Sequence, residues 1–138
     1  MNSNAKRISI VASTFNEFLV DSMIESSIKT LKEHGYDEAL IDINRVPGAF
    51  EVPLMAKKIA LSGDYKAIVA LGVIVRGATP HFDFISKTST EAIMKLSIEN
   101  KKPIGNGIIT CLNIRQAIAR KKKGREAALA VTSVLSQL

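Results

Sequence analysis

The stretch that most restricts the fold of this chain is residues 67–75, a continuous apolar run that ends at Arg76 and Gly77. A strand with one face in water alternates apolar and polar residues, whereas a continuous run is typical of a strand covered on both faces. Such strands occur in parallel sheets with helices packed on each side. This run therefore predicts the central strand of an α/β sheet.

The other segments alternate between strand and helix patterns. The predicted strands are 7–13, 39–46, 67–75 and 107–112, and the predicted helices are 17–34, 50–62, 81–100, 114–120 and 126–135. Gly35 and His34 are expected at the end of the first helix, and Gly124 is expected to separate the last two. This order predicts an α/β fold: a three-layer α-β-α sandwich with a four-stranded parallel sheet in flavodoxin-like order.

Length and composition narrow the class of protein. With 138 residues, of which 46% are hydrophobic, we expect a single domain over 1–138, in which 1–6 form a flexible or edge segment. We expect a cytoplasmic protein without a membrane partner, since no signal peptide or membrane span is evident. Cys111 is the single cysteine, which excludes an intrachain disulfide, and its apolar surroundings favour a buried thiol over a nucleophile.

The formal net charge of +6 raises the question of an anionic partner. Much of the excess lies between Arg115 and Arg125. No aromatic residue is interleaved with these cations, so nucleic-acid binding is not favoured. Two interpretations remain: a solvated helix end, or a phosphate site for a small ligand.

Ligands of open parallel sheets bind beyond the carboxyl ends of the strands. The predicted post-strand segments are 13–16, 46–51, 76–81 and 111–113, and the first three carry residues suited to a site. Phe15 can stack on a planar heterocycle or pack onto the next helix as a hydrophobic staple. Glu51 can cap its helix or accept hydrogen bonds from sugar-like hydroxyls.

The third post-strand segment combines an anion site with a proton donor. Backbone N–H groups of Gly77, Ala78 and Thr79 can hold an anion. His81 follows, and its ordinary pKa near ~6.5 lets it give and take protons, although it can also be a plain exposed residue. Arg76 and Arg120 are candidate phosphate partners, and Arg120 can equally be a helix-end cation.

Several common catalytic motifs are absent from the sequence. There is no Gly-x-Gly-x-x-Gly, Walker or Gly-x-Ser-x-Gly motif, and no His/Glu spacing typical of a metal site. From the residues alone, the chain is a small α/β domain that binds a phosphorylated or hydroxylated small molecule, with His81 as proton shuttle.

Three segments in register resemble the lumazine synthase family. They are Phe15-Asn16, Val46-Pro-Gly-Ala-Phe-Glu51, and Gly72 to His81 continuing into Phe82-Asp83; in addition, Asn113 to Arg120 resembles the family's Gln-Ala-Ile-x-Arg segment. The resemblance runs from about Ile8 to the C-terminus. It implies condensation of 5-amino-6-(D-ribitylamino)uracil with 3,4-dihydroxy-2-butanone 4-phosphate, without a metal or redox cofactor. The enzyme would act mainly by proximity, with His81 moving protons.

The resemblance also implies a role for each matching position. The pyrimidine and ribityl chain would be bound by Phe15, Asn16, Ala49, Phe50, Glu51, Val73, Ile74, Val75 and Asn106, and the phosphate by Gly77, Ala78, Thr79 and Arg120. His81 would be catalytic. The family's sites lie between neighbouring subunits of a homopentamer, so Asn106 and Arg120 would come from the adjacent chain.

The sequence departs from the family pattern at two places. Asn106 stands where the family usually has a large apolar residue, and the segment after Arg120 is shortened to Lys121-Lys-Lys-Gly124, in which Lys123 is a candidate for the family's loop lysine. This loop bears on assembly, and we expect a free pentamer or a pair of pentamers. Two alternatives stay open: a flavin- or lumazine-binding homologue without turnover, and a flavodoxin-like interaction or basic nucleic-acid-binding domain.

Overall fold

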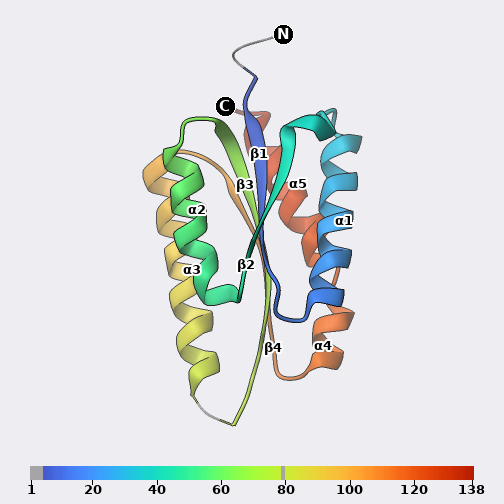
Figure 1. Cartoon of the computed structure of the whole chain (residues 1–138), viewed down its shortest axis with the longest axis vertical. Coiled ribbons are helices and arrows are strands. Elements are labelled where there is room, and N and C mark those ends of the chain that lie inside the picture. The colour runs from blue at the N-terminus through green and yellow to red at the C-terminus, as the bar shows by residue number, and fades with distance from the viewer. Residues whose placement is uncertain (1–4, 79) are drawn as a thin grey trace.

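The computed structural model describes residues 5–78 and 80–138, and Figure 1 shows a sheet between two layers of helices. The strands are β1 (Arg7–Ser13), β2 (Ile41–Val46), β3 (Tyr65–Val75) and β4 (Ile104–Cys111). The helices are α1 (Glu17–Glu33), α2 (Val52–Leu61), α3 (His81–Asn100), α4 (Ile114–Ala119) and α5 (Lys123–Leu135), with short 3-10 turns η1 (Glu38–Leu40) and η2 (Ala49–Glu51). The strands pair in parallel in the order β2-β1-β3-β4, which confirms the predicted sandwich and its flavodoxin-like order.

The sheet has one apolar core on each face. Helices α1 and α5 cover one face, where Val20, Met23 and Val131 pack on alternate strand residues such as Val69 and Leu71. Helices α2 and α3 cover the other face, where the cluster includes Ile68 and Ala70 of β3. Strand β3 is buried along its length except near its two ends, as the apolar run 67–75 predicts.

Some predicted boundaries were wrong. Strand β4 begins at Ile104 rather than at 107, since Ile104 to Asn106 pair with β3. Strand β2 is shorter than 39–46, because the Asp37 side chain accepts a hydrogen bond from Ala39 N and holds that end in η1. Strand β3 begins two residues earlier than predicted, and η2 precedes α2.

Gly124 does not separate two helices but lies inside the first turn of α5. A Cβ atom there would come within 2.7 Å of the Met23 carbonyl oxygen, so glycine is needed for the close approach of α5 to α1. The hydroxyl of Ser27 on α1 donates to the Gly124 carbonyl at 2.8 Å. The glycine that predicts a helix break from sequence thus serves helix packing in the fold.

Two interpretations of single residues are confirmed. His34 is the C-cap residue of α1, with its Nδ1 atom 2.9 Å from the Thr30 carbonyl oxygen. Cys111 is buried, and burial raises the pKa of its thiol, as expected for a structural residue rather than a nucleophile.

A polar contact joins β2 to β3 near the amino end of β3. The Tyr65 hydroxyl donates to Asp42 Oδ2 at 2.5 Å, and this hydrogen bond, together with burial, raises the pKa of Tyr65 from 10.0 to about 12. Because the folded pKa lies above the unfolded one, the stabilisation is complete below pH 10 and is lost as the pH rises toward about 12.

We therefore expect Tyr65→Phe to lower the free energy of unfolding by about 1–2 kcal/mol at neutral pH, since the Asp42 carboxylate loses the hydrogen bond that the Tyr65 hydroxyl donates. The deficit relative to the unsubstituted chain should shrink above pH 10. Urea denaturation of both proteins across this pH range measures it. A deficit that stays constant with pH would show that the loss comes from packing rather than from the hydroxyl.

Within the described ranges, 5–78 and 80–138, no helix is both long and apolar enough to cross a membrane. The cytoplasmic location stays a prediction. Of the predicted segment 1–6, residues 1–4 lie outside the described residues.

Candidate functional site

The carboxyl ends of β1, β2 and β3 meet at one end of the sheet, at the bottom of Figure 1. A hollow of about 760 Å³ opens there. Its walls come from the segments after β1 and β2, from the last residues of β3 and from the first turns of α3: Phe15, Pro47 to Glu51, Val73 to Val75, His81, Phe84, Ile85 and Thr88. The volume suits a small organic molecule. Most of the predicted site residues thus lie together at the edge of the sheet where ligands are expected to bind.

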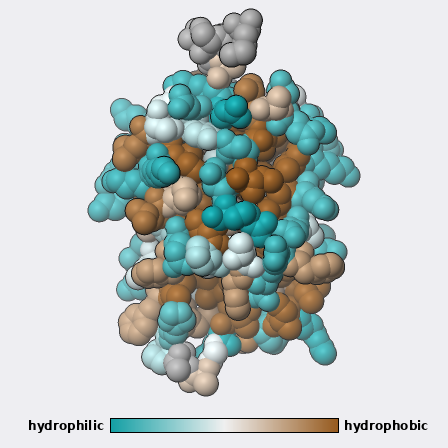
Figure 2. Space-filling view, viewed as in Figure 1, coloured by the Kyte–Doolittle hydropathy of each residue, from teal (hydrophilic) through white to brown (hydrophobic). Residues whose placement is uncertain are grey.

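Apolar side chains are exposed around this hollow. Phe15 is 54% exposed, Phe50 65% and Phe84 67%. In the same view as Figure 1, Figure 2 shows tan and brown residues across the lower half of the molecule, where the strands end. Phe15 belongs to neither core cluster and lines the hollow, which favours the stacking interpretation over the hydrophobic staple. Exposed aromatic rings beside a hollow are available to cover a planar ligand or a partner surface.

Asn16 holds the turn from β1 to α1. Its backbone is left-handed, with φ 58°, and it precedes α1 without a side-chain cap. Its Nδ2 atom is buried and has no hydrogen-bond partner among the described residues. A buried donor without a partner is costly unless a ligand or water satisfies it. Asn16 does not line the hollow itself.

The turn after β2 is closed by Glu51. Its Oε1 atom accepts from Gly48 N at 2.9 Å, which is the capping interaction. The carboxylate also lines the hollow, beside Ala49 and Phe50. One oxygen therefore shapes the wall, while the carboxylate retains further acceptor sites for a ligand hydroxyl.

One face of α3 forms the outer wall. His81 begins the helix and is exposed, and Phe84, Ile85 and Thr88 follow along the same side. Phe84, Ile85 and Thr88 were not predicted as site residues. The spacing i, i+3, i+4, i+7 from His81 places them on one helix face and is the signal that could have found them.

None of the predicted phosphate residues that the structure describes lines this hollow. Gly77 and Ala78 lie in the exposed connection between β3 and α3, and neither lines a described hollow near the strand ends. Thr79 lies outside the described residues. The backbone of Arg76 donates to the Cys111 carbonyl at 2.9 Å and continues the pairing of β3 with β4.

Asn106 and Arg120 line a second hollow, of about 470 Å³, along the free edge of β4. Its polar lining is completed by Thr90, Thr110, Lys122, Lys123 and Glu126. The Arg120 guanidinium donates from Nη1 to the Thr110 carbonyl at 2.6 Å, and this contact anchors the side chain to the strand. Its remaining N–H donors can serve an anion.

The Asn106 side chain has a structural role in this hollow. Its Oδ1 atom accepts from Ile108 N at 3.1 Å, on the outer edge of β4. An unpaired edge amide is thereby satisfied within the strand itself, which protects the edge from pairing with another chain. The amide group still belongs to the lining.

The two hollows share no lining residue within one chain. Helix α3 contributes Thr88 to the first hollow and Thr90 to the second. One chain thus brings together the stacking, hydroxyl-binding and histidine residues, and separately brings together Asn106 and Arg120. It does not place His81 and Arg120 in one cavity.

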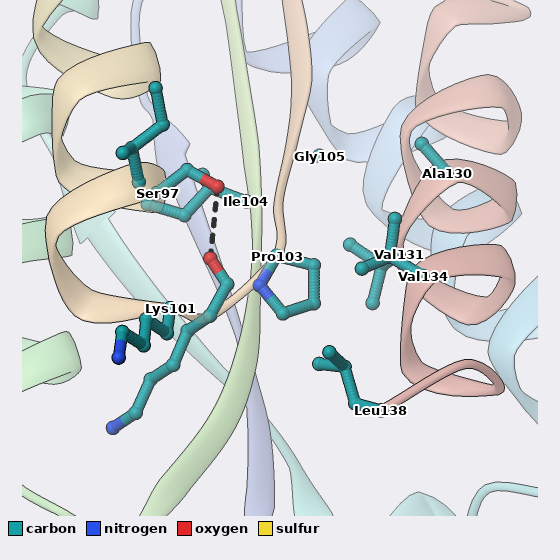
Figure 3. Close-up of a pocket in the computed structure, with 11 residues that line it drawn as sticks. Ser97, Lys101, Pro103, Ile104, Gly105, Ala130, Val131, Val134 and Leu138 are labelled. Atoms are coloured by element: carbon teal, nitrogen blue, oxygen red, sulfur yellow. Dashed lines mark hydrogen bonds between the residues drawn. The ribbon is translucent and has the colours of Figure 1, made fainter.

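A third hollow, of about 480 Å³, lies at the opposite end of β4, between the last turns of α3 and α5. On its α3 side, the Ser97 hydroxyl donates to the Lys102 carbonyl at 2.9 Å; Ser97 and the dashed line of this hydrogen bond are seen in Figure 3. The Lys102 ammonium donates to the Ala60 carbonyl at 2.7 Å, and burial lowers its pKa. None of the predicted site residues lines this hollow.

Fold and site together define an α/β domain of flavodoxin-like order, with a small-molecule hollow at the carboxyl edge of its sheet. Residues 5–138 match the sequence model of the family described as 6,7-dimethyl-8-ribityllumazine synthase. The chain belongs to this family, which confirms the resemblance seen in the three motifs; its members are transferases of riboflavin biosynthesis.

Curated relatives carry the same description. The protein of Nitratidesulfovibrio vulgaris strain DP4 is 45% identical over 136 residues, covering 95% of this chain and 87% of the relative. That of Sulfurimonas denitrificans is 42% identical over 137 residues, covering 98% and 89%. That of Chlorobium chlorochromatii is 40% identical over 141 residues, covering 99% and 91%. Each is named 6,7-dimethyl-8-ribityllumazine synthase.

Proposed function

We propose that this chain condenses 5-amino-6-(D-ribitylamino)uracil with 3,4-dihydroxy-2-butanone 4-phosphate to give 6,7-dimethyl-8-ribityllumazine. The amine attacks the ketone and water leaves as the Schiff base forms. Phosphate is then eliminated, and ring closure releases a second water. The observation that carries the proposal is the meeting of Phe15, Glu51 and His81 around one hollow in a member of this family.

Each wall of the hollow has chemistry suited to the pyrimidine substrate. Phe15 offers an exposed ring for stacking on the uracil, and the backbone of Val73 to Val75 offers donors and acceptors to its edge. The carboxylate of Glu51 accepts from ribityl hydroxyls. Asn16 lies in the turn after Phe15, outside the lining, and its buried Nδ2 is a further donor on the pyrimidine side. His81 moves protons during Schiff-base formation and elimination.

The phosphate group requires a cation, and none of the described residues that line the first hollow is a lysine or arginine. We place it on Arg120, with the backbone of Gly77, Ala78 and Thr79 supplying N–H groups. Since Arg120 and His81 line different hollows of one chain, the complete site forms where the second hollow of one subunit faces the first hollow of its neighbour. Repetition of this head-to-tail contact closes a ring, which we propose is a homopentamer.

Exposed apolar residues in the first hollow and on α4, which leads into Arg120, support this contact. Phe50 and Phe84 flank the first hollow, while Leu112, Ile114 and Ile118 lie on α4 and the turn that precedes it, close to Arg120 in the chain. Apolar side chains with this exposure favour association.

The proposal is tested by mixing the purified protein with both substrates and following lumazine absorbance and phosphate release. We expect one phosphate for each lumazine formed. Tight pyrimidine binding without lumazine would contradict the proposed synthesis and assign the chain to the non-catalytic ligand-binding alternative.

A further inference from the structure

The net charge of the chain comes from one short segment. Residues 115–125 contain six of the 19 lysines and arginines and none of the 13 acidic residues. The remainder of the chain therefore carries 13 cations and 13 acids and is neutral, and the formal +6 equals the charge of this segment. We call residues 115–125 the cationic segment.

Half of these cations line the second hollow and half do not. Arg120, Lys122 and Lys123 are part of its wall. Arg115, Lys121 and Arg125 lie outside it, are exposed, and have no side-chain hydrogen bond or ion pair within the described residues.

The three outer cations are nonetheless close to Arg120. Arg115 lies five residues back along α4 from Arg120, about 8 Å. The tight turn hydrogen-bonded from Lys123 N to the Arg120 carbonyl and from Gly124 N to the Lys121 carbonyl keeps Arg125 within about 10 Å, so both lie about one Debye length from Arg120 at physiological salt. A charge at this distance contributes to the potential at the phosphate position without touching the ligand.

We propose that Arg115, Lys121 and Arg125 attract the phosphate dianion to the second hollow over a distance, and so set its affinity without contacting it. The inference rests on the proposed function in that the dianion is the phosphate of the butanone substrate. At separations of about 10 Å, each outer cation should strengthen dianion binding about twofold at low salt, and the three together about eightfold.

The test compares two triple variants in the full chain. The first is Arg115→Gln, Lys121→Gln and Arg125→Gln. The control is Lys29→Gln, Lys58→Gln and Lys101→Gln, which removes the same charge from exposed side chains that line neither site hollow. Lys101 is seen beside the third hollow in Figure 3, at the far end of α3.

Two quantities are measured at about 20 mM and about 500 mM salt, where the screening length falls several-fold. They are the Kd of inorganic phosphate and the KM of the butanone phosphate. In the first variant we expect both to rise about eightfold at low salt and less than about twofold at high salt, with kcat and the pyrimidine KM unchanged. In the control we expect little change in either.

Unchanged phosphate binding in the first variant, or an equal loss in the control, would overturn the inference. Salt-sensitive binding of a short single-stranded oligonucleotide that is far tighter than phosphate binding and is lost in the first variant would assign the segment to a nucleic acid instead. Phosphate binding is measured without turnover. A failure of lumazine synthesis would therefore contradict the proposed function, while the Kd of inorganic phosphate would still decide the inference.

Discussion

Replacing Arg120 by alanine is expected to raise the KM for the butanone phosphate about 100-fold, with little change for the pyrimidine. A guanidinium fork bound to a phosphate dianion makes two charge-assisted hydrogen bonds, together worth about 3 kcal/mol, and each 1.4 kcal/mol is a factor of ten. The side chain is anchored at Thr110, so its loss removes a positioned donor rather than a mobile one.

Steady-state kinetics with each substrate varied in turn measures this effect. Arg120→Lys keeps the charge but loses the guanidinium fork, so its KM for the butanone phosphate should lie between those of the unsubstituted protein and Arg120→Ala. Arg115→Ala, on the same segment, is the matched control and should change the KM by no more than about twofold. An equal rise in the KM of both substrates after Arg120→Ala would remove Arg120 from the phosphate site.

His81→Ala is expected to lower kcat about 100-fold without abolishing turnover. A positioned proton donor typically contributes at least about 100-fold, while holding two reactants together contributes more. His81 is exposed at the first residue of α3 and belongs to neither core cluster, so the fold should survive its removal.

Single-turnover lumazine formation measures the chemical step in this variant. His34→Ala is the control, because it replaces the chain's other histidine at the far end of α1. Complete loss of turnover with an intact fold would contradict the view that proximity supplies most of the acceleration.

The layers of the fold could be predicted because local patterns and tertiary packing agree. The continuous apolar run that became β3 can be buried only between two helical layers, and strand–helix alternation then leaves few topologies. The wrong predictions occur where a contact between residues far apart in the sequence determines the local structure. Gly124 predicts a helix break, but its lack of a side chain instead allows α5 to pack closely against α1.

The site could be predicted in part for the same reason. Post-strand residues are brought to one edge by the sheet itself, so Phe15, Glu51 and His81 meet around one hollow. The separation of Arg120 from them depends on α3 lying between two hollows, which no local spacing encodes. The hydrogen bond between the Asn106 side chain and Ile108 N could not be predicted from sequence either, because it depends on β4 being an edge strand of the sheet.

The most direct test of the central claim, that the site is shared between neighbouring subunits, is to co-express His81→Ala and Arg120→Ala chains with different tags and purify mixed oligomers. With subsaturating butanone phosphate, each variant alone should retain about 1% of the unsubstituted activity. If His81 and Arg120 of one site come from different chains, about one quarter of the interfaces in mixed rings carry both native residues, and activity should recover to about that fraction. Activity that stays near the level of the separate variants would place both residues in the site of a single chain and contradict the account.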